Sequence, residues 1–358
     1  MRLIVYKGVD RWLGVYAGLA SAQQSLGFDQ TPEWFDAYVR HVPEHPERTL
    51  MAGVVDEGSN HLLLGIPLLS DVSGRLSIRQ LTALANYYTS LFQPLFSTSG
   101  PSQGDLLSCF VAALADGSLE WDEMSLEPMA GEAPFFGELR RALDRYGYPH
   151  TITECFTNWY LAVEGRRYET YEQSLPSKLR NTLQRKQRKL DRERGSTIRI
   201  AQDDGDLETL IRDYEAVYQQ SWKPEESHPE FIREIITRFA RQGWLRLGLM
   251  YVGDAPVAAQ LWFVKDGVAS IYKLSYDEQY ASYSVGTILT AAMMQQVLDV
   301  DRVRVVDFLT GDDAYKREWM SHSQERYRIR IYNRHTWRGR LLAFWNLRGK
   351  RLLRSTNK

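Results

Sequence analysis

Three short apolar runs follow one another between residues 245 and 276, and a glycine with an aspartate separates each run from the next. The first run alternates apolar and polar residues with a period of two, which is typical of a β-strand. Paired glycine and aspartate residues between such runs favour tight hairpin turns. The segment predicts an antiparallel meander of three strands, LRLGLMYV (245–252), PVAAQLWFVK (256–265) and VASIYKLSY (268–276).

A segment rich in helix formers, VGTILTAAMMQQVL (285–298), separates the meander from the apolar run VRVVDFL (303–309). The run ERYRIRIYN (325–333) then alternates as a strand does. A helix that connects two strands of one sheet makes them parallel, with both carboxyl ends at the same edge. Because ligands bind at that edge in such sheets, we expect a site where residues 303–309 end.

The first half of the chain repeats this order of elements without repeating the residues. Two strands are followed by a helix, a strand, a helix and a strand: TLMAGVV, HLLLGIPLL, DLLSCFVAALADG, WDEMSLEPM, FFGELRRALDRYG and TITECFTNWYLAV. We therefore predict an α/β fold with a mixed sheet, present in two copies. The expected domains are residues 1–165, residues 166–334 and a basic tail, residues 335–358.

Charge differs between the two halves although the net charge is only -1. Residues 1–165 contain 10 Lys or Arg and 20 Asp or Glu, whereas residues 166–358 contain 34 and 25. A basic second half favours an anionic partner such as a phosphorylated cofactor, nucleic acid or a membrane surface. Attraction between the two halves is the alternative.

The composition also limits cofactors and location. Two cysteines, Cys109 and Cys155, and seven scattered histidines do not form a disulfide scaffold or a metal-binding group, so we expect no metal. No apolar run is long enough to cross a bilayer, and the N-terminus lacks the layout of a signal peptide. We expect a cytoplasmic protein.

Two basic segments stand out. Residues 177–194 contain eight Lys or Arg, with Leu179, Leu183 and Leu190 on one stripe, which predicts an amphipathic helix. Its basic face is either solvated or steers an anionic donor, a carrier protein or tRNA. The tail TWRGRLLAFWNLRGKRLLR has no acidic residue, and its mixture of aromatic, leucine and arginine residues favours a helix at the anionic inner membrane face. Packing on the acidic first domain is the alternative.

Four segments together resemble a known family: SLPSKLRNTLQRKQRKLDRERGSTIRI, Ser221-Trp222, YKLSYDEQYASYSVGTIL and VVDFLTGDDAYKREW. They resemble the acyltransferases associated with bacterial cellulose and exopolysaccharide synthesis (CelD/BcsL type). That family belongs to the GNAT superfamily and has relatives among the Fem-type aminoacyl ligases. The resemblance covers roughly residues 170–320 and implies tandem GNAT-like domains, of which the second is catalytic and the first is degenerate.

The resemblance implies an enzyme that moves an acyl group from a thioester, acetyl-CoA or another acyl-CoA, to an amine or hydroxyl of a sugar or cell-envelope precursor. The donor would lie between two splayed parallel strands, with its pyrophosphate at the helix start formed by Ser284, Val285, Gly286 and Thr287. A helix start suits phosphate because it carries partial positive charge and free N–H donors. Only Gly286 matches the superfamily pattern, so acyl carrier protein and aminoacyl-tRNA stay open as donors.

Acyl transfer needs an acid for the leaving thiolate and a base for the acceptor. The resemblance implies that Tyr315 is the acid. Asp307 lies within an apolar strand, where a carboxylate must be paired or have a raised pKa, so it is either the base or the anchor of Lys316. A purely structural ion pair is the alternative, and either Asp312 or Asp313 is expected to cap the helix that carries Tyr315.

Acceptor contacts are expected on the other side of the site. Tyr272 and Lys273 are adjacent on a strand and are expected to point to opposite faces, with Lys273 near phosphate or acceptor and Tyr272 in the core or near substrate. Trp222 lies in a loop that could cover the acceptor, and His228 in that loop is a second, weaker candidate for the base. The alternatives are a core tryptophan and a solvated histidine.

Two other functions stay open. One is a Fem-like transferase that uses aminoacyl-tRNA, which would add a nucleic-acid partner. The other is a non-enzymatic accessory subunit of a polysaccharide synthase, docked on the membrane by the tail. A homodimer is compatible with either.

Overall fold

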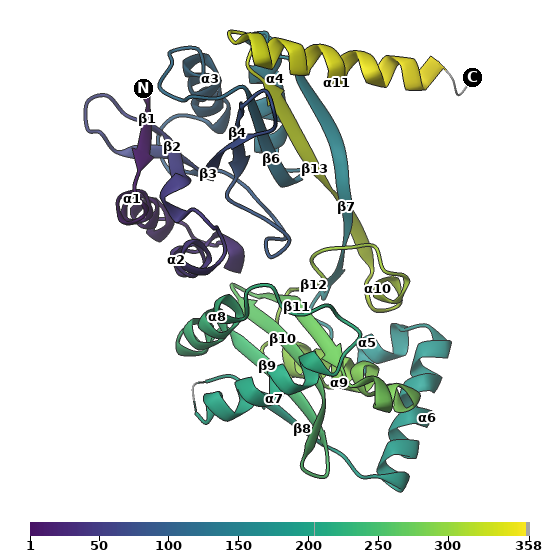
Figure 1. The fold of residues 1–358 in the computed structure, drawn as a ribbon. Helices are drawn as coiled ribbons and strands as arrows, with labels where there is room; N and C mark the ends of the chain where they lie inside the picture. The colour runs from purple at the N-terminus through teal and green to yellow at the C-terminus, as the bar shows by residue number, and fades with distance from the viewer. Residues whose placement is uncertain (204, 356–358) are drawn as a thin grey trace. The chain divides into compact units, whose positions relative to one another are not determined.

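The computed structural model describes residues 1–203 and 205–355, with the side chains of these residues up to position 347. The chain forms two compact units: unit 1 comprises Met1–Phe156 and Gln324–Lys358, and unit 2 comprises Thr157–Ser323. Strand β7 (His150–Ala162) carries the chain from unit 1 into unit 2, and β13 (His322–Tyr332) carries it back (Figure 1). The sequence had placed the boundaries after residues 165 and 334.

Unit 1 contains a mixed sheet with the strand order β1-β2-β3-β4-β6-β13. Strands β4 and β6 are parallel, and their other neighbours are antiparallel. Its elements before β7 are β1 (Arg2–Lys7), α1 (Val9–Ser21), α2 (Pro32–His41), β2 (Thr49–Val55), β3 (Leu62–Ser73), β4 (Ile78–Ala83), β5 (Leu95–Phe96), α3 (Gln103–Ala113), β6 (Glu123–Ala130) and α4 (Pro134–Arg145). Helix α11 (Trp337–Ser355) follows β13.

Apolar residues of α3, α4 and the strands form the core of unit 1. Phe110, Trp121 and Leu139 are fully buried there. Burial of each such side chain contributes about 1.5–3 kcal/mol relative to exposure. The pattern of apolar residues on α4 explains its placement, because Phe135, Phe136 and Leu139 lie on one helix face.

In unit 1, the segment that follows β4 lies beside the part of β6 that no longer pairs with β4. The two parallel strands pair only from Gln80↔Glu123 to Thr82↔Ser125. Further along, the Phe92 N–H donates to the carbonyl of Pro128 at 2.6 Å, and the Phe92 ring is buried. The segment after β4 therefore lies against β6 where the two strands no longer pair.

Unit 2 has the strand order β7-β12-β11-β10-β9-β8. Its elements after β7 are α5 (Tyr168–Ser174), α6 (Ser177–Glu193), β8 (Thr197–Ala201), α7 (Leu207–Gln219), α8 (Pro229–Arg241), β9 (Leu245–Val252), β10 (Ala255–Lys265), β11 (Val268–Tyr276), the 3-10 helix η3 (Glu278–Tyr283), α9 (Val285–Gln295), a π-helical turn (Gln296–Val300), β12 (Val305–Asp307) and α10 (Ala314–Trp319). The meander and the basic helix lie where the sequence predicted them. The predicted strand 303–309 is shorter, since only three of its residues pair.

Strands β11 and β12 are parallel and splay apart. They pair at Val268↔Val305, Ala269↔Val306 and Ser270↔Asp307, after which β12 ends and β11 continues to Tyr276. The turn after β12 holds Leu309 and Gly311 at positive φ values of 57° and 100°. A glycine meets the second of these without strain. The backbone of β11 from Ile271 onward thus lies beyond the end of its parallel partner.

The last strand of each sequence repeat pairs within the other unit. Tyr160, Leu161 and Ala162 of β7 pair with β12 of unit 2, whereas β13 pairs with β6 of unit 1. The sequence had assigned residues 151–163 to the first copy and residues 325–333 to the second. A period of two identifies a strand but does not specify its partner, which is why this exchange was missed.

Candidate active site in unit 2

Helix α9 begins beside the part of β11 that extends past β12. Ser284 occupies the N-cap with φ 58°, but its side chain makes no capping hydrogen bond. The N–H groups of Val285, Gly286 and Thr287 have no acceptor within the helix, as at the start of any α-helix. A Cβ at Gly286 would lie 3.0 Å from the Tyr276 ring, so the helix start approaches β11 closely.

A buried glutamine that sequence reasoning missed fixes this helix start. Gln260 on β10 donates from Nε2 to the Gly286 carbonyl at 3.0 Å and to Thr290 Oγ1 at 2.8 Å. Its Oε1 accepts from Trp262 Nε1 at 3.0 Å. A polar residue within an apolar strand was the available signal, since such a group must find partners when buried.

Tyr315 and Lys316 lie on α10 as predicted, with different exposure. Tyr315 is 45% exposed, and its ring lies edge-on to Phe308 at 5.6 Å between centroids. Partial burial and the charge of Asp313 raise the pKa of the Tyr315 phenol, which keeps it protonated at neutral pH. Lys316 is buried, and its Nζ donates to the carbonyls of Thr310 and Gly311.

The ion pair of Lys316 is with Asp313 Oδ2 at 3.2 Å. Burial lowers the pKa of Lys316, and Asp313 partly offsets this effect. Asp313 is the N-cap residue of α10, but its side chain makes no capping bond, so the predicted aspartate cap is present in position only.

Asp307 is held by backbone and amide donors. Its Oδ1 accepts from Asn158 Nδ2 at 2.5 Å and from the Leu309 N–H at 2.7 Å. Asn158 also donates to the Leu309 carbonyl at 2.8 Å. These bonds fix the turn by which the chain leaves β12.

Asp312 is paired with one side chain of β7 and one of α10. It accepts from Trp159 Nε1 at 2.7 Å and from Arg317 Nη2 at 2.5 Å. The hydrogen bond from Arg317, followed by that from Trp159, lowers the pKa of Asp312. The carboxylate is thus ionised and tied to the end of β7.

Tyr272 and Lys273 lie on the same side of the sheet, contrary to the prediction from simple alternation. The register between β10 and β11 shifts from Leu261↔Lys273 to Trp262↔Ile271, which makes Tyr272 the extra residue of a β-bulge. The Lys273 Nζ lies 5.9 Å from the Tyr272 ring centroid and 5.6 Å from that of Tyr218, next to α7. An extra residue breaks the period of two, and both side chains face α7 and α8.

Lys273 forms an ion pair that the sequence did not predict. Its Nζ donates to Glu226 Oε2 at 2.6 Å, and both side chains are largely buried. Burial lowers the pKa of Lys273 even though Glu226 opposes the shift. Glu226 comes from the loop between α7 and α8, so this pair connects that loop to β11.

Lys223 in the same loop was not singled out by the sequence. Its Nζ lies 5.7 Å from the Tyr218 ring centroid and 5.9 Å from that of Trp222. This Nζ makes no hydrogen bond or ion pair with any residue that the structure describes, whereas the Lys223 backbone N–H donates to Ser221 Oγ at 3.4 Å. Burial, followed by the like charge of Lys273, lowers the pKa of Lys223 to about 8. The clue in the sequence was only its place next to Trp222.

The loop that carries Lys223 also carries the other two residues that the sequence predicted near the acceptor. Trp222 is half exposed and packs on Tyr276 at 4.6 Å between centroids, and Tyr276 in turn contacts Gly286. His228 is the residue that precedes α8. A pocket of about 500 Å³ opens between α7 and α8, lined by Tyr214, Tyr218, Lys223, Glu226, Ile232 and Ile236 among others.

The described residues include no group of three His, Cys, Asp or Glu that could hold a metal ion. Within the same part of the chain, no helix combines the length and apolar character needed to cross a membrane.

These features define a mixed α/β fold of tandem GNAT-like units with splayed parallel strands in the second. Residues 177–317 match the family model described as an acetyltransferase (GNAT) domain. The match covers the whole region from α6 to α10. It supports a transferase with the GNAT fold.

Several solved structures share the fold. FemX aligns with a TM-score of 0.57 at 9% identity, covering 92% of this chain and 97% of FemX. The C-terminal domain of a putative lysylphosphatidylglycerol synthetase from Agrobacterium fabrum gives 0.55 at 11% identity, covering 91% and 93%. A tandem GNAT protein from the clavulanic acid biosynthesis pathway gives 0.51 at 12% identity, covering 94% and 100%. No curated protein matches the sequence. At these identities the likeness concerns the fold alone.

Proposed function

We propose that unit 2 is an acyltransferase that moves an acyl group from a thioester to an amine or hydroxyl. The observation that carries this proposal is the pair of splayed strands β11 and β12, with the start of α9 beside one and α10 beside the other. The free N–H groups at the α9 start suit the donor's pyrophosphate. The matching position in unit 1 is filled by the segment that includes Phe92, which favours a single donor site per chain.

In this proposal Tyr315 protonates the leaving thiolate. Its phenol is half exposed at the first turn of α10 and is protonated at neutral pH, as a proton donor must be. Lys316 is held by Asp313 and two carbonyls, and its Nζ and the Tyr315 ring centroid each lie 5.6 Å from the Phe308 ring centroid. A fixed cation there stabilises negative charge that develops during transfer.

We assign to Lys223 the role of the general base that takes the proton from the acceptor. A lysine with a pKa of about 8 is partly neutral near physiological pH, and a neutral amine accepts a proton. The sequence left Asp307 open as the base or as the anchor of Lys316, and its Oδ1 accepts two hydrogen bonds that shape a turn. The pocket between α7 and α8 gives an acceptor room to reach Lys223.

The acceptor class follows only from the family resemblance: a sugar, an exopolysaccharide or a cell-envelope precursor. Acetyl-CoA is the first donor to test, and acyl carrier protein is the second. The similarity of fold to FemX and the basic helix α6 favour a second candidate, transfer from aminoacyl-tRNA. A non-enzymatic accessory role is the remaining alternative.

Thermal unfolding of the full chain with each donor separates these functions. A ligand that binds only the folded state raises the melting temperature, and the rise grows with the logarithm of the ligand concentration divided by its Kd. We expect stabilisation by acetyl-CoA or by holo acyl carrier protein. Stabilisation by charged tRNA alone would favour the second candidate, and no stabilisation by any donor would leave only the accessory role.

A further inference from the structure

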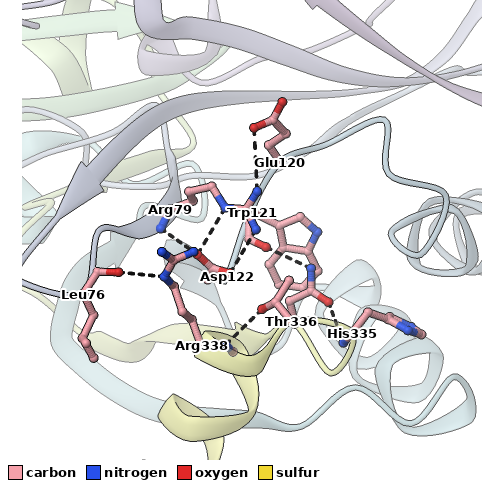
Figure 2. Close-up of polar contacts among 10 residues, drawn as sticks. Leu76, Arg79, Glu120, Trp121, Asp122, His335, Thr336 and Arg338 are labelled. Atoms are coloured by element: carbon pink, nitrogen blue, oxygen red, sulfur yellow. Dashed lines mark hydrogen bonds and ion pairs between the residues drawn. The ribbon is translucent and has the colours of Figure 1, made fainter.

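The start of helix α11 is fixed to unit 1 by a buried carboxylate. Asp122 accepts hydrogen bonds from Arg79, with Nε to Oδ2 at 3.2 Å and Nη2 to Oδ1 at 3.1 Å, and from the Thr336 hydroxyl (Figure 2). Burial alone would raise the pKa of Asp122, but these bonds hold it below its ordinary value. Asp122 therefore stays ionised and holds the residue just before α11.

Two more contacts set the direction of the helix. Arg338 donates from Nε to the Leu76 carbonyl at 2.7 Å (Figure 2). Asn333 donates from Nδ2 to the Trp121 carbonyl at 2.9 Å. Gly339 packs so closely on the Asn333 backbone that a Cβ there would lie 2.2 Å from its carbonyl oxygen. The first turn thus has one rigid position on unit 1.

One face of α11 points toward the protein. Gly339 and Ala343, four residues apart, are both buried. At 100° per residue, the opposite face carries Trp337, Leu341, Phe344 and Trp345, a stripe about 100° wide. The structure therefore orients this apolar stripe away from the face that contacts unit 1.

The aromatic residues of that stripe are open to solvent. Trp337 is 55% exposed, Phe344 49% and Trp345 56%. Apolar side chains gathered in this way mark a surface that binds a partner. The alternative from the sequence, a tail packed on the acidic first domain, does not account for the exposure of these rings, since Gly339 and Ala343 are the buried residues of α11.

The charge of this segment specifies the partner. Helix α11 (Trp337–Ser355) contains six Lys or Arg and no Asp or Glu. Arg338 and Arg340 lie on either side of the stripe, at the edges where an interfacial helix meets lipid headgroups. The aromatic rings suit the boundary of the acyl chains, and the cations beside them suit the anionic headgroups.

We infer that α11 is a docking helix for the surface of an anionic lipid bilayer. The stripe of Trp337, Leu341, Phe344 and Trp345 enters the headgroup region, and Arg340 at its edge contacts lipid phosphates. This role goes beyond acyl transfer and does not depend on it. It places unit 1, which carries the helix, at the membrane.

Flotation of the full chain with vesicles tests this inference. We expect binding to phosphatidylcholine vesicles that contain about 30 mol % phosphatidylglycerol and little binding to pure phosphatidylcholine, with loss at high salt. The combined change Trp337→Ser, Phe344→Ser and Trp345→Ser should lower the bound fraction at least about fivefold. Arg340→Glu should lower it as well.

Two control variants make the same kinds of surface change away from the stripe. Tyr87→Ser removes an aromatic ring that is 60% exposed elsewhere in unit 1, and Arg75→Glu reverses an exposed charge. Both should float like the wild type, and the melting temperatures of all variants should agree. Equal flotation of the triple variant and the wild type would overturn the inference. A loss of dimer mass in light scattering without a loss of flotation would assign the stripe to a second copy instead.

Discussion

At the scale of single residues, the chemistry was only partly visible in the sequence. Tyr315 and Lys316 could be selected because they follow the end of a parallel strand. Lys223 could not, because its importance depends on burial and on neighbours far away in the chain. Gln260 stood out only as a polar residue in an apolar strand, and its partners on α9 were not predictable from that pattern. Lys273 was selected, but its partner Glu226 was not. Their pairing depends on how a loop folds back onto a strand, which local patterns do not encode.

Tyr315→Phe tests the proposed acid. The change removes only the hydroxyl and keeps the ring contact with Phe308. We expect kcat to fall by about 10²- to 10⁴-fold, the usual contribution of a proton donor, with little change in donor affinity. Steady-state kinetics measures both, with Tyr87→Phe as the control. An unchanged kcat would remove Tyr315 from the mechanism.

The pH dependence of turnover tests Lys223. A base with a pKa of about 8 is protonated and inactive below that value, so kcat/KM should rise as pH increases through about 8. Lys223→Arg stays protonated throughout and should lose this rise along with about 10²-fold or more of the rate. Lys265→Met is the control, since that lysine pairs with Asp266 at the β10 turn. A wild-type profile that is flat between pH 7 and 9 would contradict the assignment.

At the scale of elements, the sequence predicted the meander of β9, β10 and β11, the helix α9 and the basic helix α6. Apolar residues recur in these segments at a regular spacing over many positions, so the pattern indicates only one type of secondary structure for each. The bulge at Tyr272 and the exchange of β7 and β13 were missed. Both depend on the register between strands, and register is set by tertiary packing rather than by the local pattern.

Gln260→Leu tests how β10 positions α9. The change removes both donors to α9 and leaves the buried Trp262 N–H without its acceptor. We expect the free energy of unfolding to fall by about 1–3 kcal/mol, the cost of an unsatisfied buried group. Urea unfolding followed by circular dichroism measures this, and the KM for the donor should rise because the helix start is displaced. An unchanged urea midpoint would show that the network does not hold the helix.

At the scale of the whole molecule, the sequence predicted two GNAT-like units, and the shared fold with a tandem GNAT protein confirms that fold class. The contrast between the units is informative. Unit 1 covers β6 with its own chain, whereas in unit 2 the strands splay beside an uncapped helix start. The basic α11 belongs to unit 1, so the excess positive charge counted in the second half is divided between the units. This division explains why the charge of a sequence half did not identify one partner.

Calorimetric titration of acetyl-CoA into the full chain and into Gly286→Val tests the central claim most directly. A side chain at Gly286 meets the Tyr276 ring and displaces the helix start, whereas Gly18→Val on α1 meets no neighbouring atom and is the control. We predict that the wild type and Gly18→Val bind alike and that Gly286→Val binds at least about tenfold more weakly, a loss of about 1.4 kcal/mol. Equal affinity in all three proteins would place the donor elsewhere and contradict the account.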